Sequence, residues 1–324
     1  MVAYKVPHRT PGGSWGRQRS RSPAAPRNGA GAGAGASLLG NVKGQQLRCL
    51  TAMPATWACD CSKRSGFRCG QTPAQAIRTA LSPRHNEFYN ILTDLLPMVF
   101  FFGAAAASAL GYGRPAYDAA PSWLRHSFLL TTTFTAIQHL LSLFAHTFSS
   151  VSAQLSHTVW LLDYVGIALN FVNNAPAITF VSFPELSYLW PCWLAVNLMV
   201  SAVLIIGAAW LVATCDPSAE GFPSSLFDLI FDFSTPGAAM VSATVVGLLF
   251  LPNGFGTIIA GFVADWRCGA IVACLFSGIV VKQRHIPERW LAPGRLDLSV
   301  MHSHCVWHFM VWALQVGYMV STTN

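Results

Sequence analysis

The sequence predicts an all-α membrane protein, a seven-transmembrane helix bundle with a disordered basic N-terminal tail. Of its 324 residues, 53% are apolar and only 10% are charged, whereas about 25% are charged in a typical soluble domain. Several apolar runs also approach the roughly 20 residues that a helix needs to cross the hydrocarbon core of a bilayer. These two observations exclude an ordinary soluble enzyme.

Seven segments are long and apolar enough to be candidate spans, some only just. They cover residues 91–110, 127–148, 159–180, 190–215, 236–252, 267–281 and 304–319. The fifth and sixth are the weakest, because Asp265 and Arg267 interrupt the apolar run and residues 254–281 can be divided differently. An odd number of spans places the two ends of the chain on opposite sides of the membrane.

The N-terminal tail, residues 1–85, precedes the membrane domain at residues 86–320. Residues 17–37 are rich in Arg, Ser, Pro, Gly and Ala, with too few bulky apolar side chains to offset the entropy of ordering. Asp60 is the one acidic residue before Glu87, against thirteen Lys or Arg. This positive flank favours a cytosolic N-terminus. An Arg-rich and Ser-rich start is also typical of organelle transit peptides, so import is the alternative.

Four ionisable side chains point to a functional site. They are His146, Asp163, His304 and His308. Ionisable residues inside a membrane are costly and are usually retained for a function. Imidazole is the commonest neutral zinc ligand, and three protein ligands with an open position are typical of catalytic zinc. His139 would lie two turns deeper than His146, roughly 10 Å away by helix rise, which makes it a poor fourth ligand.

The parity of the spans predicts that these side chains meet. The connections at 149–157 and 282–302 should lie on one face of the membrane, so that His146 ends the second helix and Asp163 begins the third. The two terminal histidines would begin the seventh helix. Ser142 precedes His146 by four residues, and the terminal histidines are also four apart. Residues at that spacing share one helix face.

Three stretches resemble the progestin and adipoQ receptor family, which is related to bacterial haemolysin III proteins. They are NEFYNILTD at 86–94, SLFAHTFSSVSAQLSHTVWLLDYVGIA at 142–168 and IPERWLAPGRLDLSVMHSHCVWH at 286–308, within a similarity that covers residues 86–319. The AHTFSS wording is closest to the membrane progestin receptor branch. The family's first motif typically reads Asn-Ile-x-Thr-His, whereas this chain has Asp94 at the last position.

The Asp94 departure affects a predicted polar stripe. Glu87, Asn90 and Asp94 stand at helical spacing and are expected to face the bundle interior. An acceptor carboxylate thus replaces a side chain that could donate. The departure leaves the zinc ligands untouched but removes a donor from any proton relay or ligand contact through the stripe.

The resemblance implies a seven-helix receptor with Zn²⁺ near the cytosolic face, held by His146, His304 and His308. Its ligand would be a steroid, a lipid or an adipokine-like molecule. The expected partners are this ligand and the lipid bilayer, with no nucleic acid, and a homo-oligomer is left open. The membrane would be the plasma membrane or an endomembrane.

The family is also similar to alkaline ceramidases, which implies an alternative, a zinc-dependent amide hydrolase acting on ceramide. Zinc would activate a water molecule and polarise the amide carbonyl. Asp163 would act as general base, and Ser142 would stabilise the developing oxyanion or orient a ligand. Asp163 separates this alternative from the receptor, because a purely structural zinc ion has no need of a general base. A third class, a haemolysin-type pore or transporter, has less support, because the sequence shows no inverted repeat and no ladder of polar residues through several spans.

Overall fold

The computed structural model describes residues 68, 70–111, 121–182, 184–214, 284–291 and 295–323, with shorter pieces between 270 and 282. Its helices are α2 (Pro73–Ala80), α3 (Phe88–Ala109), α5 (Ser122–Phe148), α6 (Ala153–Ser182), α7 (Trp190–Thr214) and α12 (Ser303–Thr323), with the 3-10 turns η1 (Pro184–Leu189) and η2 (Glu288–Trp290). The described residues contain no strand, in agreement with the all-α prediction.

Four helical stretches are long and apolar enough to cross a membrane. They are Phe88–Ala109, Ser122–Phe148, Gln154–Asn174 and Glu185–Gly207. They correspond to the first four predicted spans, and α12 overlaps the predicted seventh span. The predicted fifth span, most of the sixth and residues 1–67 lie outside the described residues. The first three helices begin at Phe88, Ser122 and Ala153, earlier than residues 91, 127 and 159, because polar side chains at helix ends dilute the apolar signal.

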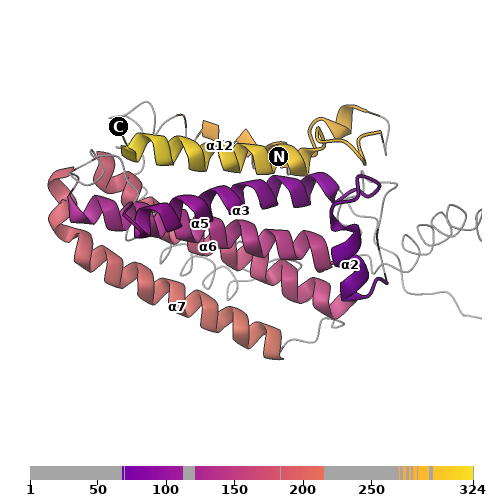
Figure 1. Cartoon of the computed structure of the whole chain (residues 1–324), viewed down its shortest axis with the longest axis horizontal. Helices are drawn as coiled ribbons and strands as arrows, with labels where there is room; N and C mark the ends of the chain where they lie inside the picture. The colour runs from indigo at the N-terminus through magenta and orange to yellow at the C-terminus, as the bar shows by residue number, and fades with distance from the viewer. Residues whose placement is uncertain are drawn as a thin grey trace, which may run out of the picture. The chain divides into compact units, whose positions relative to one another are not determined.

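The helices pack side by side (Figure 1). Helix α5 contacts α3 and α6, helix α6 also contacts α7, and α12 lies against α3 and α5. Helices α5 and α6 approach closely at Gly166, where a Cβ atom would lie 3.1 Å from the Cα atom of Gln138. Small residues allow such close approach between membrane helices. Helices α5, α6 and α12, which carry the predicted site residues, therefore meet around α5.

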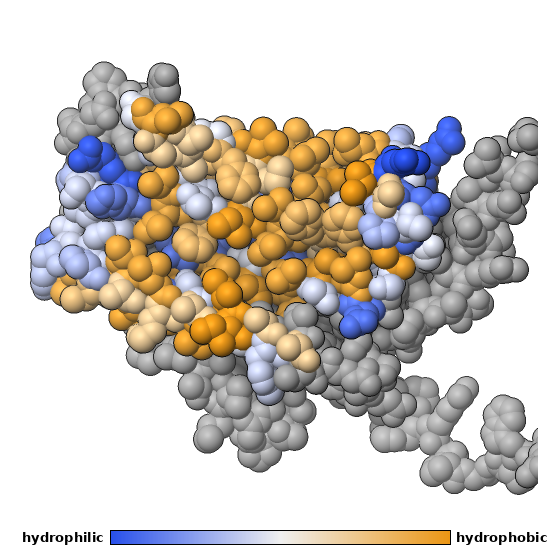
Figure 2. All heavy atoms as spheres, turned by 60° about the horizontal axis from the view of Figure 1, so that its bottom comes forward, coloured by the Kyte–Doolittle hydropathy of each residue, from blue (hydrophilic) through white to orange (hydrophobic). Residues whose placement is uncertain are grey.

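The interior of this bundle is polar, and much of its outer surface is apolar. Buried polar side chains include Asn90, Thr132, Thr135, Gln138, Asn170 and Gln315. Exposed apolar side chains include Leu96, Val99, Leu198, Ile206 and Trp210. Figure 2 shows apolar residues along the helices on one face, with hydrophilic residues gathered towards the two ends. A soluble protein has the opposite distribution, whereas helices surrounded by lipid satisfy their polar groups internally.

Helix α2 lies inside the segment that was expected to be disordered, so the tail boundary at residue 85 is too late. Thr72 and Gln75 form a capping box, and a proline occupies the first turn, which is a pattern that starts helices. Arg68 then joins this segment to the end of α5, donating to the carbonyl oxygens of Ala76 at 3.2 Å and His146 at 2.7 Å. A cation is favourable beside the last carbonyls of a helix. The folded segment thus fixes the turn of α5 that carries His146.

His85 links α2 to α3 in its neutral form. Its Nε2 atom lies 2.9 Å from the carbonyl oxygen of Thr79 and 3.1 Å from that of Ala80. Its Nδ1 atom accepts the Glu87 amide hydrogen at 3.2 Å, so this nitrogen must be unprotonated. Burial lowers the pKa of His85, and the nearby Arg68 lowers it further, although the two backbone carbonyls and Glu87 act in the opposite direction.

Acidification is therefore expected to lower the melting temperature of the protein. Because the pKa of His85 is depressed in the folded state, its stabilisation is complete above the unfolded-state value of about 6.5 and is lost as pH falls from there through the folded-state pKa. His85→Gln, whose amide can still donate but cannot titrate, should show a smaller decrease between about pH 7.5 and about pH 5. Equal decreases in the two proteins would contradict this role.

Candidate metal centre

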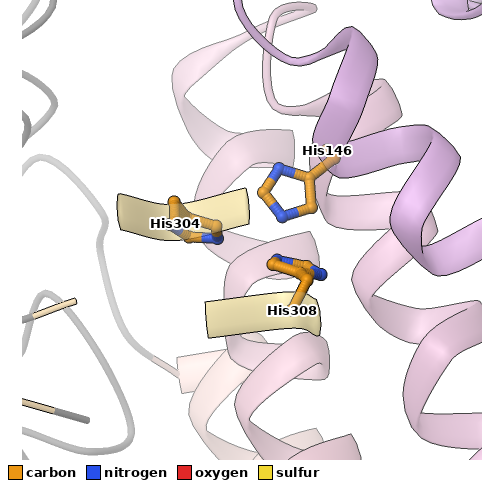
Figure 3. Close-up of side chains that lie close together, drawn as sticks. All are labelled: His146, His304 and His308. Carbon is orange, nitrogen blue, oxygen red and sulfur yellow. The ribbon is translucent and has the colours of Figure 1, made fainter. Parts of the chain in front are cut away.

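Three histidines from two helices come together in the bundle. His146 lies in the last turn of α5, and His304 and His308 lie one turn apart at the start of α12. One nitrogen from each ring lies within 4.8 Å of the others. The ring centroids are 5.0 Å apart for His146 and His304, and 5.2 Å apart for His146 and His308. Figure 3 shows the α5 ring beside the two α12 rings. This cluster could hold a metal ion.

The hydrogen bonds of the cluster determine which nitrogens face it. The Nδ1 atom of His146 bonds to Glu87 Oε2 at 2.7 Å, and its buried Nε2 atom has no hydrogen-bond partner among the described residues. The Nδ1 atom of His308 bonds to Asp94 Oδ1 at 3.0 Å. A buried nitrogen without a partner is costly. Binding a cation is one way to satisfy the Nε2 atom of His146.

Asp163 and Ser142 lie beside the histidines. Both line a small cavity that His304 and His308 also line, with room for about one water molecule. The Oδ1 atom of Asp163 is buried and has no hydrogen-bond partner in the part of the chain that the structure describes. The cavity therefore brings together a carboxylate, a hydroxyl and two of the imidazoles. The same cavity is lined by the cation Lys282.

Asp163 does not begin its helix as expected. Helix α6 begins at Ala153, so Asp163 lies in its third turn. Trp160, about one turn earlier, packs edge-on against His146 with ring centroids 5.0 Å apart. Asp163 thus lies about a turn deeper in the bundle than the ring that covers His146. It reaches the cavity at the level of Ser142 rather than at the helix end.

The polar stripe of α3 faces the interior, as the sequence predicted. Asn90 is 0% exposed and Asp94 is 1% exposed. Asn90 donates to Glu87 Oε2 at 2.7 Å, the same oxygen that bonds His146. Asp94 Oδ1, which bonds His308, also lies 2.9 Å from the Nδ1 atom of a second histidine, His139. Sequence reasoning identified the stripe but missed these partners, because they come from other helices.

His139 belongs to a buried polar chain and not to the three-histidine cluster. Its Nε2 atom lies 2.7 Å from Gln315 Oε1. The Gln315 amide donates to Gln138 Oε1 at 2.9 Å, and the amide of Asn170 donates to the same oxygen. Thr135 donates to Asn170 Oδ1 at 3.0 Å. The chain thus joins α3, α5, α6 and α12.

The expectation that no ladder of polar residues runs through several spans is therefore wrong. Helix α5 contributes Thr135, Gln138 and His139, whereas α3, α6 and α12 contribute one of the named side chains each, so no single helix displays the whole chain. Packing in hydrocarbon brings them together, since every polar group there needs a partner. The side chains bond to one another, and the cavity at the Asp94 end has room for about one water molecule.

Residues 83–318 match the sequence model of the family described as haemolysin-III related. The chain belongs to this family. It is 28% identical over 250 residues to membrane progestin receptor gamma of Mus musculus, covering 76% of the chain and 71% of that protein. It is 29% identical over 264 residues to membrane progestin receptor delta of Homo sapiens, covering 75% of the chain and 69% of that protein.

A third relative is an uncharacterised protein of Schizosaccharomyces pombe, 24% identical over 278 residues, covering 82% of the chain and 57% of that protein. The resemblance expected from the three motifs is confirmed, including the membrane progestin receptor branch. Together with its apolar helices, this makes the haemolysin-III related chain a multi-pass membrane protein.

Proposed function

We propose that this chain is a membrane receptor of the progestin and adipoQ receptor type, which holds Zn²⁺ within its helix bundle and responds to a steroid or other lipid ligand. The observation that carries the proposal is the convergence of His146, His304 and His308 within 4.8 Å, in a chain whose relatives include membrane progestin receptors. The metal would tie α5 to α12, so that a ligand which shifts either helix can be sensed.

The donor set suits zinc. Neutral imidazoles are good zinc ligands, and three of them leave one position open. Ligand nitrogens of tetrahedral zinc lie about 3.3 Å apart when each is about 2.0–2.1 Å from the ion. The nitrogens here lie within 4.8 Å of one another, so small side-chain rotations would close the site. The Nε2 atom of His146, which no described residue hydrogen-bonds, gives a reason for this closure.

Binding of a radiolabelled progestin to the full chain in lipid nanodiscs tests the receptor proposal. Saturable binding that unlabelled steroid displaces is the expected result. His308→Ala should weaken it if zinc joins the helices around the ligand. His126→Ala is the matched control, because His126 is an exposed residue of α5. Absence of saturable binding for progestins and for other lipids would contradict the proposal.

The proposed topology is seven spans with a cytosolic N-terminus. The described helices α3, α5, α6, α7 and α12 would supply five of them, and residues 215–281 the other two. The basic tail supports the orientation. Tags placed at the two ends are expected to differ in protease sensitivity in sealed membrane vesicles from cells. Equal protection of both tags would mean an even number of spans.

A second candidate function is hydrolysis of a lipid amide such as ceramide. The buried Oδ1 atom of Asp163, which has no hydrogen-bond partner among the described residues, favours it, because Asp163 lines the cavity shared by Ser142 and two of the histidines. A bound zinc ion would supply Lewis acidity at this place. Asp163 would take a proton from the attacking water, and the Ser142 hydroxyl would donate to the developing oxyanion. In this scheme the product of hydrolysis is the receptor's signal.

A further inference from the structure

Each of two carboxylates on α3 bonds the Nδ1 atom of one histidine of the cluster. Glu87 and Asp94 are seven residues apart, which is about two helical turns, so they lie on one face of α3. Glu87 Oε2 lies 2.7 Å from the Nδ1 atom of His146, and Asp94 Oδ1 lies 3.0 Å from the Nδ1 atom of His308. Each carboxylate therefore engages the ring nitrogen that the three-histidine cluster does not need.

We propose that Asp94 is the positioning carboxylate of His308, as Glu87 is of His146, and that it strengthens metal binding without touching the ion. This inference rests on the proposed zinc site. By accepting the Nδ1 hydrogen, the carboxylate fixes the tautomer in which Nε2 carries the lone pair. Carboxylates that orient metal-bound imidazoles in this way typically contribute about 10-fold to 100-fold in metal affinity.

The structure holds Asp94 firmly in this position. His139 approaches the same Oδ1 atom at 2.9 Å and is itself bonded to Gln315 of α12 at 2.7 Å. The ring of Phe101 stacks on His139, with centroids 6.3 Å apart and planes 3° from parallel. The acceptor is thus fixed from α5 and α12 as well as from its own helix. A fixed acceptor restricts the rotation of the His308 ring.

Charge gives Asp94 a second reason to favour a cation. Its Oδ2 atom is buried and finds no hydrogen-bond partner within the described residues, and Asp94 lines the cavity beside His304 and His308. The three imidazoles of the cluster are neutral when they act as ligands, so they do not offset the ion's charge. Two nearby carboxylates would do so. A buried carboxylate with an empty oxygen is costly by itself, and a neighbouring divalent cation lowers that cost.

Zinc affinity of the purified full chain, measured by competition with a chelator, tests the inference. Asp94→Asn keeps an acceptor but loses the charge, and we expect about 10-fold weaker zinc binding. Asp94→Ala loses both and should weaken binding by up to about 100-fold. Thr93→Val is the matched control, because the Thr93 hydroxyl donates to two carbonyl oxygens of its own helix, those of Tyr89 at 2.8 Å and Asn90 at 2.9 Å. Its zinc affinity should equal that of the wild type.

Two further readouts separate positioning from a general structural role. The Co²⁺-loaded protein should show a changed visible absorption spectrum in Asp94→Asn, since the His308 ring is freer to turn. The zinc-free melting temperature of Asp94→Asn is measured beside it, because the substitution also weakens the acceptor that faces His139. The loss of zinc affinity is expected to exceed what any loss of zinc-free stability explains. Asp94→Asn is isosteric, so it decides the question if Asp94→Ala does not fold.

Unchanged zinc affinity and an unchanged Co²⁺ spectrum in Asp94→Asn would overturn the inference and leave the zinc site intact. A loss of zinc affinity that is fully explained by a loss of zinc-free stability would also overturn the inference. A wild-type protein that binds no zinc would instead overturn the proposed site itself. Because the wild type is measured in every series, the two failures are distinguishable.

Discussion

Alanine at position 146, 304 or 308 is expected to abolish stoichiometric zinc binding and to lower the melting temperature. His146→Ala removes the α5 ligand, and His304→Ala or His308→Ala removes one of the two α12 ligands. A ligand that binds only the folded state stabilises it by mass action, by about 4 kcal/mol when its concentration is a thousand times the Kd. Zinc content by mass spectrometry and thermal unfolding with and without a chelator measure both effects.

Chelator treatment provides the internal comparison. It should lower the melting temperature of the wild type and leave each of the three variants nearly unchanged, because they have no metal to lose. His126→Ala, an exposed histidine change in the same α5 helix, should keep its zinc and its chelator response. A ligand variant that still shows the full chelator response would rule out that histidine as a ligand.

Asp163→Asn is expected to keep the metal and to lose most hydrolytic turnover if the chain is a lipid amidase. Asp163 lies beside the cluster and is not one of the three residues that could hold an ion. Assistance by a general base is typically worth about 10²-fold to 10⁴-fold in rate. Release of fatty acid from long-chain ceramide by the purified protein, measured beside its zinc content, gives both quantities in one preparation.

The same variant separates the two candidate functions. A receptor with structural zinc should release no fatty acid above background, and Asp163→Asn should leave its ligand-evoked signal largely intact. Thr158→Val is the matched control in α6, since the Thr158 hydroxyl bonds to the Gln154 carbonyl oxygen of its own helix at 3.1 Å. Wild-type protein with full zinc and no turnover of any lipid amide would end the hydrolase candidate.

Composition and the cost of burying polar groups were enough to predict the helical membrane class and the inward direction of several side chains. His146 and Asp94 are each 1% exposed and His308 is 6% exposed, as expected for ionisable groups in a membrane. Their burial follows from the cost of exposing an ionisable side chain to lipid, which depends only on the type of residue. One sequence without an alignment is therefore enough to predict it.

Hydropathy placed the start of α6 at residue 159, whereas the helix begins at Ala153. Asp163 was therefore predicted to lie nearer the start of the helix than it does. The first turns of α6 contain Gln154 and Ser156, which dilute the apolar signal, although a helix tolerates polar residues where it leaves the bilayer. Ser152 accepts the Leu155 amide hydrogen at 3.2 Å, which is a helix-start signal that was visible in the sequence. Weighting such capping residues would have corrected the boundary.

Hydrogen bonds between side chains of different helices also could not be predicted from the sequence. The bond between Asp94 and His139 joins residues 45 positions apart, and the bond between His139 and Gln315 joins residues 176 apart. Such contacts depend on the rotation of each helix about its axis, which packing at sites such as Gly166 sets. No local pattern in the sequence encodes them. The buried polar chain was missed for this reason, and with it the partners of Asp94.

Zinc stoichiometry of the purified full chain tests the central claim most directly, with wild type compared against the His304→Ala, His308→Ala double variant. The account predicts about one zinc ion per wild-type chain and no bound zinc in the double variant, because a single remaining imidazole does not hold the ion. His126→Ala should match the wild type. Full zinc retention by the double variant, or a wild-type protein that takes up no zinc, would contradict the account.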